Sequence, residues 1–328
     1  MTKRELVLRA LRGERVERVP IGFWFHFVDN EAAADGLKDD SFLRANFEGH
    51  RKFYTDFKPD LVKIMSDGFF VYPNELFAAA KTPADLRAVK PLGKNHRWIE
   101  KQIEHVSRIT ALFNGEIVSF YNVFAAATLF KFLRWESGTG DAALARLIKE
   151  DAQAVRSALD AVAEDLAVLA GRVTAESGVD GIYFSTQDVG GLTPEQNNAV
   201  VRPSDESVLR AGGGCSILHI CGYEGHHNGL SRYADYPAQI LNWAVSVEGI
   251  PLGAGKTTIF GGRPVIGGFA NTKNGILYRG TREEVEAETA RILAESGHTG
   301  IILGADCTIP KDINLERLEW VRKAGQIA

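Results

Sequence analysis

A histidine and a cysteine two positions apart, His219 and Cys221, end the apolar run of SILHICGYEG, residues 216–225. Side chains two apart on a β-strand face the same way, with Cα atoms roughly 6.5–7 Å apart, so both can reach one ion between them. A further cysteine, Cys307, ends the apolar run GIILGADC. One imidazole and two thiolates with an open fourth position are typical of catalytic zinc, whereas structural zinc usually has four protein ligands. The three residues are therefore a candidate zinc site.

Each ligand taken alone has a simpler interpretation. A single histidine or cysteine on an apolar strand is more often a core residue than a metal ligand. Cys215 has the same strand parity as His219, but it lies roughly 13 Å back along the strand, too far for a bond near 2.3 Å. We expect Cys215 in the core or at the bottom of the fold. Asp306, next to Cys307, should point to the opposite face and be structural.

The elements that must position these residues alternate along the whole chain. Short runs rich in β-branched and aromatic residues are separated by helical patterns, such as residues 141–177 and residues 281–296, the latter starting with a capping box from Thr281 to Glu284. This alternation predicts parallel strands joined by crossover helices. The expected strands are eight: residues 21–27, 61–65, 116–124, 180–186, 216–221, 239–245, 264–269 and 300–305.

Eight strand and helix pairs favour a closed (β/α)8 TIM barrel over an open sheet. A dinucleotide-binding sheet would show a glycine fingerprint after its first strand, and FWFHFVDNEAAADG has none. The segment LGAGKTT, residues 252–258, lacks the first glycine of a phosphate-binding loop, so we expect an ordinary loop there. No linker or low-complexity tract divides the chain. We predict an α/β fold with a single barrel domain over residues 1–328.

In such barrels the active site lies at the C-terminal ends of the strands. The prediction therefore takes the polar residues found there as site candidates. Asp67, at the exit of the second strand, is the candidate catalytic carboxylate. Five further residues are candidate substrate contacts: His26, Asn122, Gln187, Asn242 and Asn271.

Composition excludes several partners. The net charge is −4, and no cluster of lysine and arginine interleaved with aromatic residues is present, so nucleic acid is not expected. The first 16 residues carry charges throughout and resemble neither a secretory signal nor a membrane span, so we expect a cytoplasmic protein. Three cysteines do not make a disulfide framework. Apolar helix faces leave room for a homodimer.

Several motifs together resemble the uroporphyrinogen decarboxylase superfamily over nearly the whole chain. They are the opening MTKRELVLRALRGERVERVPIGFWFHF, then SDG (66–68), TPEQ (193–196), LHICG (218–222), GGFANT (267–272), YRGTREEVEAET (278–289) and ILGADCTIPKDINLERLEWV (302–321). That family is a (β/α)8 barrel. The His-x-Cys followed by a distant Cys is similar to its branch of zinc-dependent methyltransferases, which act with methylated corrinoid proteins.

The resemblance implies a function for the candidate zinc site. His219, Cys221 and Cys307 match the positions that hold zinc in that branch, where zinc binds a small thiol substrate as thiolate. The thiolate then exchanges a methyl group with a corrinoid cofactor. The chain shows no corrinoid-binding domain of its own, so a separate corrinoid protein is the expected partner.

Three alternatives to a methyltransferase remain. True uroporphyrinogen decarboxylases carry an arginine-rich RQAGRY-like segment near the N-terminus, and this chain has FWFHFVDNEAA there. Asp67, however, matches the aspartate with which those enzymes hold pyrrole NH groups, so decarboxylation of a tetrapyrrole is the second candidate. The third is a barrel that binds a metal or corrinoid without catalysis. A zinc hydrolase is less favoured, because thiolate ligands make zinc a weaker Lewis acid.

Overall fold

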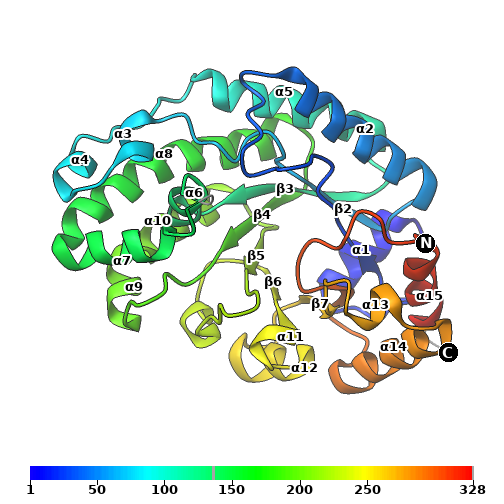
Figure 1. Ribbon diagram of the computed structural model, residues 1–328. Helices are drawn as coiled ribbons and strands as arrows, with labels where there is room; N and C mark the ends of the chain where they lie inside the picture. Colours follow the sequence, from blue (N-terminus) through cyan, green and yellow to red (C-terminus); the bar gives the residue numbers. More distant parts are fainter. Residues whose placement is uncertain (135–136, 327–328) are drawn as a thin grey trace.

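The fold is a parallel β-barrel enclosed by helices, seen in the computed structural model, which describes residues 1–134 and 137–326 (Figure 1). The strands lie in one sheet in the order β1-β8-β7-β6-β5-β4-β3-β2, and every hydrogen-bonded pair is parallel. This confirms the predicted (β/α)8 barrel. The strands are β1 (Ile21–Gly22), β2 (Leu61–Ile64), β3 (Val118–Phe124), β4 (Gly181–Thr186), β5 (Ile217–Ile220), β6 (Ile240–Trp243), β7 (Val265–Phe269) and β8 (Ile301–Ala305).

Helices surround the strands, and both chain ends lie beside α15 in Figure 1. No helix among the described residues is both long and apolar enough to cross a membrane. The α-helices are α1 (Lys3–Leu11), α2 (Asp40–Phe57), α3 (Glu75–Ala79), α4 (Pro83–Arg87), α5 (Arg97–Phe113), α6 (Ala126–Phe132), α7 (Gly140–Glu150), α8 (Ala152–Glu176), α9 (Pro194–Val200), α10 (Arg202–Ala211), α11 (Val245–Glu248), α12 (Leu252–Ala254), α13 (Ile276–Arg279), α14 (Arg282–Ser296) and α15 (Glu316–Ala324).

Three details of the helices follow from local chemistry. Residues 141–177, expected as one helical stretch, form α7 and α8, because the side chain of Asp151 caps α8 by accepting from the Ala154 N–H. The predicted capping box at the start of α14 is confirmed, with Thr281 and Glu284 each bonding the other's backbone. The expected loop at residues 252–258 is instead helical, since it contains α12 and most of the π-helical turn Gly255–Ile259.

The prediction of a first strand over residues 21–27 is wrong beyond Gly22. After β1 the chain leaves the sheet but stays largely buried. The Trp24 ring packs edge-on against the Tyr183 ring, with 5.1 Å between the ring centroids. The backbone carbonyl of Trp24 accepts a hydrogen bond from the Ile309 N–H. The apolar character of residues 23–27 thus reflects packing across the barrel, which periodicity cannot distinguish from pairing in a sheet. This departure carries His26 towards the barrel mouth.

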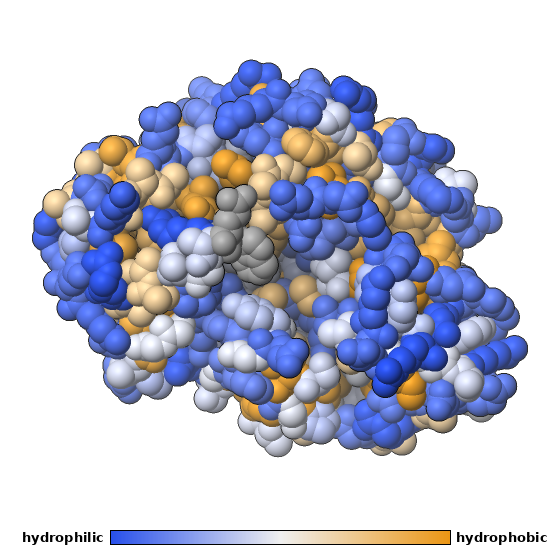
Figure 2. Space-filling model, viewed as in Figure 1, coloured by the Kyte–Doolittle hydropathy of each residue, from blue (hydrophilic) through white to orange (hydrophobic). Residues whose placement is uncertain are grey.

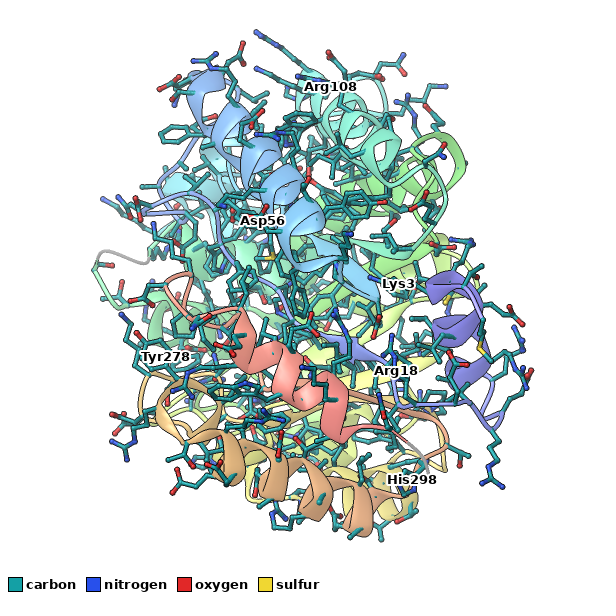
Figure 3. All side chains as sticks on the ribbon, turned by 90° about the vertical axis from the view of Figure 1, so that its right-hand side faces the viewer. Lys3, Arg18, Asp56, Arg108, Tyr278 and His298 are labelled. Carbon is teal, nitrogen blue, oxygen red and sulfur yellow. The ribbon has the colours of Figure 1, made fainter. Side chains whose placement is uncertain are left out.

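The seam between β1 and β2 is closed by a side chain. The two strands are neighbours without a hydrogen-bonded ladder, and the buried carboxylate of Asp60, just before β2, accepts from the Ile21 N–H at 3.0 Å. The same carboxylate takes two bonds from the Arg18 guanidinium, at 2.6 and 2.7 Å. Figure 3 shows Arg18 beside the N-terminal helix and Lys3, whose ammonium bonds the Lys58 carbonyl after α2. Asp60 is therefore a structural clamp.

Alternation on each strand divides the core in two. Leu61 on β2 and Met65 directly after it belong to the cluster inside the barrel, whereas Val62 and Ile64 pack outward under the helices. The inner cluster also holds Val7 of α1, so this helix plugs one end of the barrel. The remaining inner side chains are Trp24, Val118, Phe120, Tyr183, Ile217, Ile240, Ile266 and Ile302. The other end carries the polar residues.

Candidate metal centre and active-site cavity

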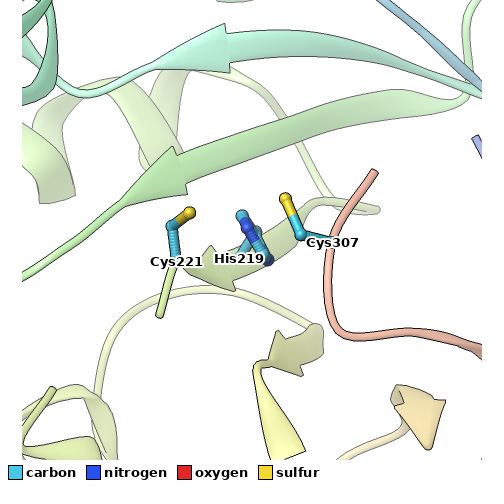
Figure 4. A group of neighbouring side chains, drawn as sticks. All are labelled: His219, Cys221 and Cys307. Atoms are coloured by element: carbon cyan, nitrogen blue, oxygen red, sulfur yellow. The ribbon is translucent and has the colours of Figure 1, made fainter. Parts of the chain in front are cut away.

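The three predicted metal ligands meet at the barrel mouth (Figure 4). His219 lies on β5, Cys221 directly follows that strand, and Cys307 lies two residues beyond β8. One ligand atom from each lies within 4.8 Å of the others. Donor atoms around a tetrahedral zinc are roughly 3.5 Å apart, given bonds of about 2.0–2.3 Å. The group thus needs only a small contraction to hold one ion.

The orientation of the imidazole fits a metal ligand. Asn242 donates both amide hydrogens, to the carbonyls of Ile266 and Ala305, so its Oδ1 is an acceptor. His219 Nδ1 therefore carries the hydrogen and donates to this oxygen at 2.5 Å, and the Tyr183 hydroxyl donates to it at 2.7 Å. The other ring nitrogen, Nε2, is buried and has no hydrogen-bond partner among the described residues. Its lone pair is available to a metal.

Asn242 is therefore reassigned from substrate contact to orientation of His219. Its side chain is fully buried, and both polar atoms already make hydrogen bonds.

We expect Asn242→Leu to weaken zinc binding about 10–100-fold, because the His219 ring loses the acceptor that fixes its tautomer and direction. Competition with a chromophoric chelator measures the change. Gln187→Leu, which removes a buried amide that makes no hydrogen bond to His219, Cys221 or Cys307, is the matched control; equal affinities in both variants would contradict this role.

The thiols of Cys221 and Cys307 differ in their acidity. Hydrogen bonding from the Cys221 thiol, with a smaller effect of His219, holds the pKa of Cys307 well below its usual value despite burial. The same bond, together with burial, raises the pKa of Cys221. A cysteine binds zinc as its thiolate, so the Cys307 side of the pair is already in the binding form. Cys215 lies elsewhere, against the apolar cluster that fills the barrel.

A cavity of about 170 Å³ opens beside the two sulfurs. Cys221 and Cys307 form part of its wall, and Phe70, Phe124 and Phe132 form an aromatic side, with ring centroids 4.6–5.2 Å apart. A larger pocket of about 380 Å³ shares Ala32, Phe70 and Phe132 with it and lies further out. The face in Figure 2 is largely hydrophilic and is hollowed near its centre. The other polar lining residues are His26, Glu31, Lys63, Ser185 and Thr308.

His26 and Asp67 form a hydrogen-bonded pair at this cavity, but they occupy different positions relative to it. Asp67 is fully buried and does not line the cavity, whereas His26 does. Burial alone would raise the pKa of Asp67, but bonds from His26 Nδ1 (2.7 Å), the Phe27 N–H (2.8 Å) and Asn46 (3.3 Å) lower it below its usual value. The ionised carboxylate therefore holds the hydrogen on Nδ1. His26 Nε2 is left as a proton acceptor, 3.9 Å from Glu31.

The other three predicted substrate contacts flank the cavity without lining it. Asn122 donates to the Ser66 hydroxyl at 3.0 Å, and its buried Oδ1 has no partner among the described residues. The buried Oε1 of Gln187 is also without one in that part of the chain. Asn271 donates to the carbonyl of Thr308 at 3.0 Å and so braces the turn that carries Cys307.

Asp306 anchors that turn from the other side. Its buried carboxylate accepts from the backbone N–H groups of Val245 and Ser246 at 2.9 and 3.0 Å, and from the Ser246 hydroxyl. These bonds tie the end of β8 to the start of α11, which follows β6. Asp306 thus has a structural position next to a ligand.

Sequence reasoning missed four polar residues of the cavity: Glu31, Lys63, Ser185 and Thr308. A signal existed for Lys63, a charged residue within the apolar strand LVKIM and in phase with the inward Leu61 and Met65. Ser185 shares the inward parity of Tyr183 on β4. Thr308 lies on a turn, where alternation gives no direction.

Comparison with known proteins agrees with this architecture. The sequence profile of the uroporphyrinogen decarboxylase (URO-D) family matches residues 73–326. The chain belongs to the uroporphyrinogen decarboxylase family. No curated protein sequence matched this family member.

Among solved structures, a methyltransferase from Methanosarcina mazei is similar, with a TM-score of 0.73, 16% identity, and coverage of 99% of this chain and 98% of the other. A B12-independent methionine synthase from Shewanella sp. W3-18-1, in complex with selenomethionine, has a TM-score of 0.52 and 14% identity over 96% of both chains. At these identities the likeness shows a common fold.

Proposed function

We propose that this uroporphyrinogen decarboxylase family member is a zinc-dependent methyltransferase that moves a methyl group between a corrinoid on a partner protein and a small thiol. The observation that carries the proposal is the convergence of His219 Nε2, unpartnered and buried, with two cysteine sulfurs beside a cavity. Three ligands of this type leave a fourth position for a substrate. The similarity of the fold to that of a methyltransferase from Methanosarcina mazei supports the same proposal.

The residues at the cavity have different roles in the proposed reaction. His219, Cys221 and Cys307 would hold the zinc, which when bound stabilises a substrate thiol as thiolate near neutral pH. His26, held by Asp67, offers Nε2 to take the proton that the thiol releases. A corrinoid on the partner protein would supply the methyl group: the S–CH₃ bond would form as the C–Co bond breaks, and the bonding electron pair would stay on cobalt. The protein itself supplies position and a desolvated nucleophile.

The dimensions of the cavity support a small acceptor. Pockets for drug-sized molecules are roughly 300–1,000 Å³, and the space beside the sulfurs is about 170 Å³. The outer pocket is mostly apolar and adjoins this space through Phe70 and Phe132. We assign it to the approach of the methyl donor, carried by a separate corrinoid protein.

Two features disfavour tetrapyrrole decarboxylation. The Asp67 carboxylate, which would hold pyrrole NH groups, is fully buried and already bonded to His26, Phe27 and Asn46. The arginine-rich segment expected near the N-terminus is replaced by FWFHFVDNEAA. Neither Asp67 nor the segment FWFHFVDNEAA offers a binding surface for the NH groups and propionates of such a substrate.

The test is methyl transfer from free methylcobalamin to 2-mercaptoethanol by the zinc-loaded protein. The loss of the methylcobalamin absorbance measures the rate. We expect turnover in the wild type and a loss of at least about a hundredfold in Cys307→Ala, because one thiolate ligand is removed. Circular dichroism checks that the variant keeps its fold. Absence of transfer to any thiol, alongside CO₂ release from uroporphyrinogen, would support the decarboxylase instead. Binding without turnover of either kind would support a non-catalytic barrel.

A further inference from the structure

A lysine inside the barrel has no role in the function derived so far. Lys63 lies on β2 between the inward Leu61 and Met65, and its residue surface is only 4% exposed. It lines the same cavity as Cys221 and Cys307. Lysine is almost never fully buried unless it is paired, so its position needs an explanation.

Lys63 has no carboxylate partner. Among the described residues it makes no hydrogen bond or ion pair, and its Nζ faces two aromatic rings, 4.0 Å from the centroid of Tyr183 and 5.4 Å from that of Trp24. Lys131 shows the usual arrangement: it is equally buried, but its Nζ is 2.9 Å from an Asp141 oxygen. The direct contacts of the Lys63 ammonium are therefore with ring faces.

The negative groups within its reach are the metal ligands. Burial lowers the pKa of Lys63 to about 8, and Coulomb interactions with Cys307, Cys221 and Asp67, in that order, act against the shift. Lys63 is thus mainly an ammonium at neutral pH. Tyr183 links it to the centre, because its ring faces the ammonium while its hydroxyl bonds Asn242, the residue that orients His219.

Charge counting shows what this ammonium can do. Zinc with two thiolates and one neutral imidazole is neutral, so a third thiolate, from the substrate, leaves one negative charge in a buried site. A buried charge without a partner is costly. An ammonium in the same cavity compensates it.

We propose that Lys63 supplies the positive charge that stabilises the substrate thiolate beside Cys221 and Cys307. The inference rests on the proposed function and adds a positioning residue to it. Loss of the thiol proton, taken up by His26, and arrival of the thiolate beside the ammonium leave the site neutral overall. The interaction acts on the sulfur itself, so it requires no second charged group on the thiol.

The experiment is calorimetric titration of the zinc-loaded protein with two thiols, neutral 2-mercaptoethanol and anionic 3-mercaptopropionate. We expect Lys63→Met to keep its zinc and to bind both thiols at least about tenfold more weakly than the wild type, as for opposite charges several ångströms apart at an effective dielectric constant near 20. Ile64→Val alters packing on the same strand but on the side that faces the helices, and should bind both thiols like the wild type. Lys63→Gln serves if Lys63→Met fails to fold.

Three results would overturn the inference, and they are distinguishable. Unchanged affinity of Lys63→Met for both thiols would remove the role of Lys63 and leave the zinc site intact. A loss confined to 3-mercaptopropionate would assign Lys63 to an anionic arm of the substrate instead. A wild type that holds zinc but binds neither thiol would overturn the proposed function, and this inference with it.

Discussion

Alanine at Cys307 should lower bound zinc from about one ion per chain to nearly none. Two ligands remain in the variant, His219 and Cys221, and two are fewer than the three or four protein ligands that zinc sites use. The loss should exceed the 10–100-fold expected for Asn242→Leu, because a bond to the metal is removed rather than the group that orients a ligand. Elemental analysis of protein dialysed against a weak chelator measures it.

The chain offers a matched control for this experiment. Cys215 is also a partly buried free cysteine, but it packs against the apolar cluster that fills the barrel, away from the mouth. Cys215→Ala should therefore keep its zinc, while His219→Ala and Cys221→Ala should behave like Cys307→Ala. Full zinc content in any of the three ligand variants would show that the ion, if one binds, is held elsewhere.

The convergence of His219, Cys221 and Cys307 could be predicted from the sequence because it depends on two robust rules. Residues two apart on a strand share a face, which brings His219 and Cys221 together, and ends of parallel strands meet at one edge of a barrel, which brings Cys307 to them. The alternation of strands and helices likewise predicted the barrel. Neither rule depends on where each neighbouring side chain points.

The roles of the polar residues could not be predicted, because they depend on the register between strands. His219 is the register partner of Asn242, and this pairing turns a candidate substrate contact into a support for the ligand. His26 and Asp67 are 41 positions apart and lie outside the strands, and their contact places His26 at the cavity wall and Asp67 behind it. A list of polar strand ends cannot tell which groups face the cavity and which face one another.

Asp60→Ala should lower the free energy of unfolding by about 3–5 kcal/mol, the cost of breaking a buried ion pair by removing one partner. Asp60 is fully buried and accepts two bonds from Arg18 and one from the Ile21 N–H across the seam between β1 and β2. The variant leaves the guanidinium, only 16% exposed, without its counter-charge. Urea unfolding followed by circular dichroism measures the change.

An exposed pair and a double variant separate this effect from a general loss of charge. Lys52 and Asp56 form an ion pair on the surface of α2, and Lys52→Ala should change stability by no more than about 0.5 kcal/mol. Adding Arg18→Met to Asp60→Ala removes the stranded charge and should restore part of the loss. Stability of Asp60→Ala equal to the wild type would mean that the β1–β2 seam is held by packing alone.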